Sequence, residues 1–152
     1  MALPNRSPNR SPNRNRLLTR PSRWLTRYLW ASPATAVGLL LAFIVSLSGA
    51  RAQVVDGALE VAGGRLTAIL ARLPRWLRFG AITFGHVIVA VDQPQLDRSR
   101  AHEQVHVRQY ERWGILFFPL YLGSSLSALL RGQQPYRDNR FEREARLESE
   151  AA

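Results

Sequence analysis

Residues 28–50, YLWASPATAVGLLLAFIVSLSGA, form a run of 23 residues without a charged side chain, and this run limits the possible folds most. An α-helix of about 20 apolar residues is long enough to cross the hydrocarbon core of a bilayer. Tyr28 and Trp30 stand at its start, where aromatic side chains favour the membrane interface. We therefore predict a transmembrane or signal-anchor segment over 28–50, with a helix that begins in the turn at Pro33.

An arginine-rich tail precedes this segment. Residues 1–27 carry seven arginines and no acidic residue, and the repeat NRSPNRSPNRNR at 5–16 is too rich in Asn, Ser and Pro to pack a core. We predict a disordered tail over 1–27, which the positive-inside rule places in the cytoplasm. A signal peptide cleaved near LSGARA (47–52) is the alternative.

The net charge of +10 does not by itself indicate a nucleic-acid-binding protein. Much of the excess lies in the tail, and all 21 basic residues are arginine. Phosphate binding rarely excludes lysine, so we expect membrane lipid and not nucleic acid as a partner. The chain has no cysteine, which excludes disulfides and thiolate ligands, so any metal must be bound by His, Asp, Glu or water.

The rest of the chain, 51–152, predicts a small α+β domain with an antiparallel sheet. VVDGALEV contains Asp56-Gly57 between two apolar runs, which is a hairpin signal. The β-branched run AITFGHVIVAV at 81–91 predicts one buried strand, and DQPQLDRS after it predicts a loop. Between them, the Gly-led segment 63–80 predicts a short amphipathic helix.

Two further helices are predicted after the strands. One covers 98–114, with Asp97 or Ser99 as its cap and Gly114 at its end. The other is the terminal helix 141–152, capped by Asp138 or Asn139.

The first of these helices contains HEQVH at 102–106. Four residues correspond to about one helical turn, so His102 and His106 lie on one face and can bind one metal ion. Glu103 lies beside them and can contact a water molecule on that metal, which is why this spacing occurs in zinc hydrolases. An ordinary solvated helix with two unrelated histidines is the alternative interpretation.

A catalytic zinc ion of this type needs a third protein ligand. His86 is the only other histidine, and its position in a strand is equally typical of a core histidine. Glu142 and Glu144 open the terminal helix about 200° apart around its axis, so only one of them can face the site. Glu111 follows His106 too closely on the same helix to reach the same metal.

Other polar residues are candidates for supporting roles. Gln109 follows His106 by three residues and could hydrogen-bond an imidazole or a carboxylate that supports the metal ligands. Tyr110 and Tyr136 are candidate donors to an oxyanion, although aromatic side chains more often pack in the core.

The blocks HEQVHVRQYERWG (102–114) and YRDNRFEREA (136–145) together resemble the zincin metallopeptidases whose third ligand is a glutamate on a later helix. The resemblance implies a Zn²⁺ ion, Glu103 as the catalytic base and a peptide or protein substrate. It places the third ligand at Glu142, the first acid of a Glu-x-Glu-Ala pattern. The chain looks closer still to small, uncharacterised bacterial membrane-associated proteins, which implies a membrane-anchored minimal zincin-like domain at the inner membrane.

The second uncharged segment, ILFFPLYLGSSLSALL at 115–130, bears on this site. If it and 28–50 both crossed the bilayer, Glu142 would lie about 30 Å from His102 across the hydrocarbon, and one metal could not bind both. We therefore predict a buried or membrane-dipping helix here, although the arginines that follow (Arg131, Arg137, Arg140) keep two spans as an alternative. A non-catalytic membrane protein with a structural or vestigial metal site is the alternative function.

Overall fold

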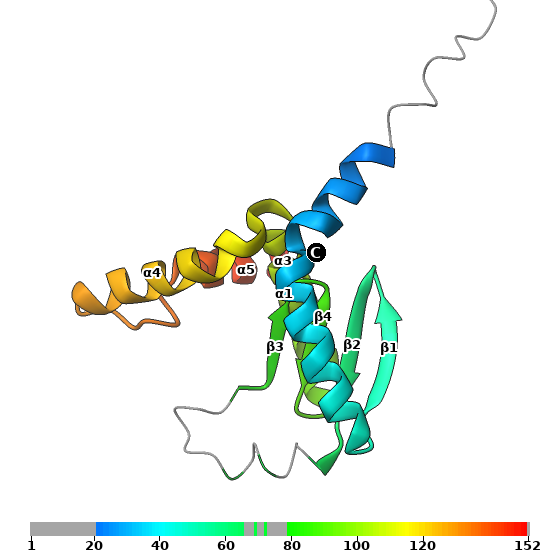
Figure 1. Cartoon of the computed structure of the whole chain (residues 1–152). Helices are drawn as coiled ribbons and strands as arrows, with labels where there is room; N and C mark the ends of the chain where they lie inside the picture. The colour runs from blue at the N-terminus through cyan, green and yellow to red at the C-terminus, as the bar shows by residue number, and fades with distance from the viewer. Residues whose placement is uncertain (1–20, 66–68, 70–71, 73–78, 152) are drawn as a thin grey trace, which may run out of the picture.

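The chain folds into a mixed α+β domain with a small four-stranded sheet (Figure 1). The computed structural model describes residues 21–65, 69, 72 and 79–151. Its elements, in chain order, are α1 (Pro21–Leu47), β1 (Arg51–Val55), β2 (Ala58–Ala62), β3 (Ala81–Phe84), β4 (Val87–Ala90), α3 (Gln93–Trp113), the 3₁₀ helix η3 (Gly114–Leu116), α4 (Phe117–Leu130) and α5 (Arg140–Glu150). The tail residues 1–20 and most of the expected helix in 63–80 lie outside the described residues.

The strand order is β1-β2-β4-β3, and the sheet is mixed. β1 pairs with β2 and β3 pairs with β4 in antiparallel fashion, but β2 and β4 run parallel. The expectation of an antiparallel sheet is therefore wrong for its central pair. Two hairpins lie side by side, and the long connection between them supplies the crossover that parallel pairing requires.

Glycine-containing turns make both hairpins. Asp56 and Gly57 have φ values of 50° and 81°, as a tight two-residue hairpin turn requires, so the first predicted hairpin is confirmed. The run 81–91, predicted as one strand, is instead β3 and β4 joined at Gly85 and His86. Gly85 has a φ of 60°, which allows the chain to reverse within an apolar run that looks continuous.

The sheet is covered by α1 on one face and by α3 on the other. Successive side chains of a strand point to opposite faces, and the buried clusters follow this alternation. One cluster joins α1 to the sheet and contains Ala42, Val45, Val61, Val87 and Val89. The other lies between the sheet and α3 and contains Ala58, Ala62, Ile88, Ala90, Leu96 and Val107.

The structure corrects the predicted start of α1. The helix begins at Pro21, so it includes the end of the predicted tail, and Pro33 lies in its interior. Proline cannot donate to the carbonyl four residues earlier, which here is that of Leu29. The Ser32 hydroxyl donates to this carbonyl at 2.7 Å, which compensates for the missing hydrogen bond.

The start of α3 is also earlier than predicted. The predicted loop around Pro94 is the first turn of this helix, and neither Asp97 nor Ser99 caps it. The cap is Asp92, whose side chain accepts from the backbone N–H of Gln95 at 2.7 Å. Proline is favoured in a first helical turn because its missing N–H would have no helical partner there. The helix ends at Gly114, as predicted.

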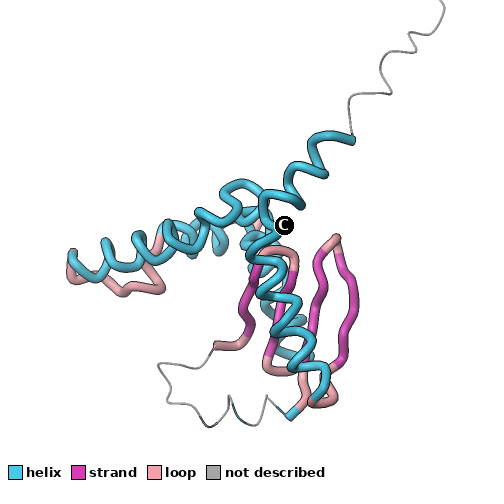
Figure 2. Tube along the Cα trace, in the orientation of Figure 1, coloured by secondary structure: helices cyan, strands magenta, loops and turns pink. Residues whose placement is uncertain are grey.

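Two helical stretches are long and apolar enough to cross a membrane, Tyr28–Leu47 and Gln93–Leu130. The second consists of α3, η3 and α4. The segment from α4 to the start of α5, residues 117–139, extends away from the sheet and returns as a loop, and we call it the α4 arm (Figure 2). The arm brings α5 back against α3.

We predict opposite effects of Gly→Ala at two helical positions, Gly38 in α1 and Gly123 in α4. A Cβ on Gly38 would lie 2.7 Å from the Phe84 carbonyl oxygen and from the Val87 Cβ, whereas one on Gly123 meets nothing within 4 Å. Gly123→Ala should raise the free energy of unfolding by about 1 kcal/mol through helix propensity. Gly38→Ala should lower it by about 1–3 kcal/mol through overpacking. Denaturant titration in detergent measures both, and equal stabilisation would show that α1 does not pack on the sheet.

Candidate metal centre

Helix α3 carries His102 and His106 on one face, as the one-turn spacing predicts. Their Nε2 atoms are 3.1 Å apart, and the rings are nearly perpendicular, at 84°. His106 is buried, and the side chain of His102 retains 19% exposure. The pair therefore points its Nε2 atoms toward one position at the edge of a cavity.

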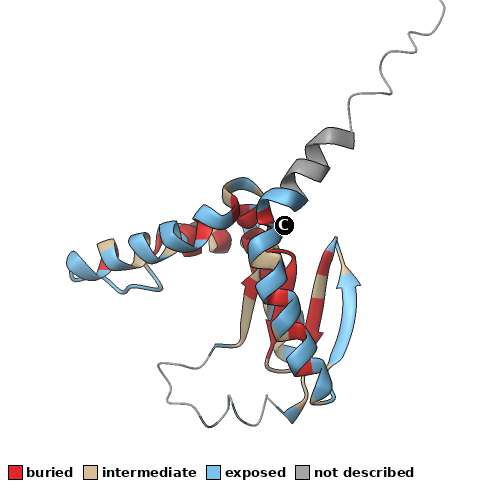
Figure 3. Ribbon diagram, in the orientation of Figure 1, coloured by how far each residue is buried: buried red, intermediate tan, exposed pale blue. Residues whose placement is uncertain are grey.

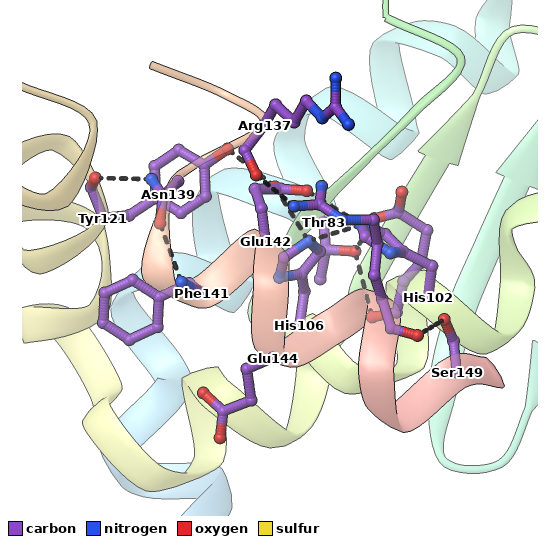
Figure 4. Close-up of polar contacts among 12 residues, drawn as sticks. Thr83, His102, His106, Tyr121, Arg137, Asn139, Phe141, Glu142, Glu144 and Ser149 are labelled. Carbon is purple, nitrogen blue, oxygen red and sulfur yellow. Dashed lines mark hydrogen bonds and ion pairs between the residues drawn. The ribbon is translucent and has the colours of Figure 1, made fainter. Parts of the chain in front are cut away.

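Helix α5 brings Glu142 to this position because its first turn is fixed by a buried cap (Figure 4). Asn139, one of the two predicted caps, accepts from the Phe141 N–H at 2.9 Å. Its amide nitrogen donates to the Tyr121 carbonyl at 3.0 Å and to the Ser125 hydroxyl at 2.7 Å. Asn139 thus joins the start of α5 to α4 and sets the direction of the Glu142 side chain.

The three side chains form a buried group that could hold a metal ion. Besides the two imidazoles, 3.1 Å apart, His102 Nε2 lies 3.2 Å from Glu142 Oε2, and His106 Nε2 lies 3.3 Å from Oε1. Two nitrogen ligands about 2.0 Å from a tetrahedral ion are about 3.3 Å apart. The separations therefore match the edges of a small tetrahedron, and the ligand atoms all lie within 4.8 Å of one another.

Charge also favours a cation at this position. Burial alone would raise the pKa of Glu142, but the contacts with His102, His106 and Tyr121 outweigh it and hold this pKa well below its usual range. Burial opposes the charged form of His106, yet Glu142 and Glu103 raise its pKa. Glu142 Oε2 is buried without a hydrogen bond among the described residues. An ionised carboxylate with one oxygen buried and without a hydrogen bond is suited to bind a metal ion.

Gln109 fixes the orientation of His106, and it contacts both an imidazole and a carboxylate, that of Glu144. The Gln109 amide nitrogen donates to the Phe141 carbonyl at 3.1 Å and to Glu144 Oε2 at 3.2 Å, and both of these groups only accept. Its oxygen must therefore face His106 Nδ1, 2.8 Å away, which makes Nδ1 the donor. The lone pair of His106 is then on Nε2, the atom that points into the site.

Glu144 points away from the site, as expected. It contacts Gln109 and lies 3.7 Å from Arg112 of α3, because α5 packs directly along α3.

His86 is also separate from the site. It lies in the β3–β4 turn, where its ring stacks on Tyr28 and its Nε2 is 3.4 Å from Glu111 Oε1. It is therefore a buried histidine between α1 and α3, which is the alternative that its position in the sequence left open.

Glu103 lies in the wall of the same cavity. The Thr83 hydroxyl of β3 donates to Glu103 Oε2 at 2.6 Å and holds this carboxylate next to the histidine pair. The cavity has a volume of about 250 Å³, and its walls come from β3, α3, α4 and α5, with Phe79 and Tyr136 from the adjoining loops. Apart from the polar groups already named, its lining is mainly apolar and aromatic: Phe79, Ala81, Ile82, Phe84, Tyr110, Phe117, Phe118, Tyr121 and Tyr136.

The tyrosines differ from the expectation. Tyr121, which was not expected at the site, donates its hydroxyl to Glu142 Oε1 at 2.8 Å. Tyr136 is 61% exposed and lies at the rim of the cavity, which Glu142 also lines. Tyr110 packs against Phe117. The sequence does contain an indication for Tyr121. Its spacing from Ser124 and Ser125 puts the three polar side chains on one face of an otherwise apolar helix.

The donor set fits a metal centre, with two imidazole nitrogens, one carboxylate and a second carboxylate beside them. No family model, curated protein or solved structure matches this chain. The geometry of the site therefore carries the functional argument.

We predict that Glu142→Gln weakens Zn²⁺ binding by about an order of magnitude or more, because a direct anionic ligand is lost. Glu144→Gln, two residues away on the same helix, should change the affinity little because its carboxylate contacts Gln109 and Arg112 and not the two histidines. Competition with a chromogenic chelator measures both constants. The reverse ranking would show that Glu144, and not Glu142, is the ligand. Unchanged affinity in both variants would show that the third ligand is another residue.

Proposed function

We propose that this protein is a membrane-associated zinc metallopeptidase. The observation that carries the proposal is the meeting of His102, His106 and Glu142 from two helices, with Glu103 in the same cavity. Two imidazoles and one carboxylate leave a fourth position for water, which is the arrangement of catalytic zinc sites.

Zinc is the metal that this donor set suits best among the common divalent ions. Imidazole ligands disfavour magnesium and calcium, which prefer oxygen donors. When bound, zinc would lower the pKa of a coordinated water and polarise a substrate carbonyl.

Glu103 is proposed as the general base. It neighbours His102 in the chain but projects from a different direction around α3, so it is suited to contact a water molecule and not the metal. The Thr83 hydrogen bond holds one oxygen, which leaves the other for the proton. Tyr136, at the rim of the cavity that Glu142 also lines, is proposed to donate to the oxyanion.

A peptide or protein is the proposed substrate. β3 is at the edge of the sheet, and all four of its residues line the cavity. An extended peptide can pair with such an edge through its main chain, which would bring its backbone past Glu103.

The membrane part of the proposal is based on the two apolar helical stretches. Seven arginines within residues 1–27 favour a cytoplasmic location of the tail, because the anionic cytoplasmic leaflet attracts basic segments. We place the protein at the inner membrane of a bacterium.

A non-catalytic membrane protein with a structural metal site is the second candidate. The contacts of Glu142 with two imidazoles and the Tyr121 hydroxyl favour it, because they stabilise the carboxylate in the absence of a metal. Hydrolysis separates the two candidates.

The test is hydrolysis of a denatured protein by the zinc-loaded chain in detergent. We expect cleavage that a chelator abolishes and that Glu103→Gln lowers by about 10²–10⁴-fold, the usual contribution of a general base. This variant should keep its zinc because Glu103 is not a ligand. Glu148→Gln, an exposed carboxylate of α5, is the control and should cleave normally. Zinc binding without any cleavage would favour the structural site.

A further inference from the structure

The polarity of α4 is the reverse of that of a helix on a water-soluble protein. Its polar groups face inward: Tyr121 donates to Glu142, Ser125 accepts from Asn139, and Ser124 accepts from the Arg140 N–H. Its large apolar side chains face outward, with exposed fractions near one half or above for Leu122, Leu126, Leu129 and Leu130. Residues 114–130 contain no charged side chain.

The two sides of helix α1 differ in the size of their side chains. Small side chains face the protein, at Ala31, Gly38 and Ala42, and permit close packing on the sheet. Large ones face outward, and Leu40, Phe43 and Leu47 are each more than 60% exposed. This arrangement, with small residues at the protein contact and large apolar residues outside, is typical of helices that pack within a membrane.

Helices α1 and α4 both lie on the viewer's side of the elements that they cover (Figure 1). In Figure 1, α1 lies in front of the sheet and α4 lies in front of α5, and Figure 3 shows exposed surface along both helices. The helices meet where Trp30 packs on η3, since a Cβ on Gly114 would lie 2.3 Å from the Trp30 Nε1. We call the outward surfaces of α1 and α4 the apolar face.

We propose that the apolar face docks into one leaflet of an anionic lipid bilayer, with α1 in the plane of the membrane and not across it. A lipid surface fits the face because it carries no charge and its outward side chains are mostly aliphatic. Tyr28 and Trp30, both partly exposed, suit the headgroup level, and exposed Arg51 and Arg131 follow the two helices. Arginines at this boundary complement anionic headgroups.

The sheet determines that α1 lies in the plane. It follows α1 along the apolar length of the helix, because Gly57 at one end of β2 lies near Tyr28 and Gly64 beyond the other end lies near Ser48. If α1 crossed the bilayer, the outer edge of β1, with exposed Arg51 among its residues, would lie in the hydrocarbon. Open sheet edges do not occur there because their unpaired backbone groups would have no hydrogen-bond partner in lipid.

The metal cavity then opens beside the membrane surface. Phe118 is 53% exposed on the apolar face and also lines the cavity. Peptide segments at the membrane surface are thus the substrates closest to the site. This inference rests on the membrane association proposed above but not on peptidase activity.

Depth-dependent quenching tests the proposal, and the absence of cysteine allows single labels. The full chain carries Leu40→Cys or Leu126→Cys on the apolar face, or Val54→Cys on exposed β1, each with a small fluorophore. The probe is a vesicle of phosphatidylethanolamine and phosphatidylglycerol with bromines near either the headgroup or the methyl end of the acyl chains. Flotation with the vesicles measures membrane association separately.

Both apolar-face labels should lose fluorescence, more with bromines near the headgroup, and the Val54 label should lose none with bromines at the methyl end. Strongest quenching of the Leu40 label at the bilayer centre, together with quenching at Val54, would show that α1 crosses the membrane. Chains that float while both apolar-face labels remain unquenched would assign this face to a protein partner. Chains that do not float would overturn membrane association as well, and neither result bears on zinc-dependent hydrolysis.

Discussion

The contact of one buried carboxylate with two imidazoles is the interaction on which the rest of the structure depends. Glu142 reaches His102 and His106 only because α5 returns along α3 after the α4 arm. Asn139 fixes this return by capping α5 and bonding to α4, and Gln109 joins the metal-facing surface of α3 to the backbone of α5. The energy of these buried polar groups is favourable only when all of them are paired, so the arm, the cap and the histidine pair form one cooperative unit.

The same unit relates the site to the proposed membrane surface. The inner side of α4 supplies Tyr121 to Glu142, while its outer side is apolar and exposed. A helix that is apolar outside and polar inside is unfavourable in water, because exposed apolar area is not removed from solvent. A bilayer would remove this cost and would keep α4, and thus the cap of α5, in place. We therefore expect lipid to stabilise the metal site from a distance.

Local signals in the sequence were sufficient for several parts of the site. The one-turn spacing of His102 and His106, the Asn139 cap and the orientation of Glu142 against Glu144 all depend on helix periodicity within a few residues. Non-local features were missed. The parallel pairing of β2 with β4 depends on the 18-residue segment that joins the two hairpins, and the turn at Gly85 is hidden inside an apolar run. The start of α3 at Asp92 differs from the predicted loop, although an Asp cap with proline in the first turn is a favourable helix start. The contact of Tyr121 with Glu142 depends on the return of α5 beside α4, which local spacing does not predict.

X-ray absorption at the zinc edge, on the purified full-length protein, tests the central claim most directly. The account predicts close to one zinc ion per chain, with four ligands of nitrogen and oxygen at about 2.0 Å and the multiple scattering of two imidazoles. The His102→Ala/His106→Ala double variant should lose both the metal and this scattering. A wild-type protein that binds no zinc, or a spectrum without imidazole scattering, would contradict the account.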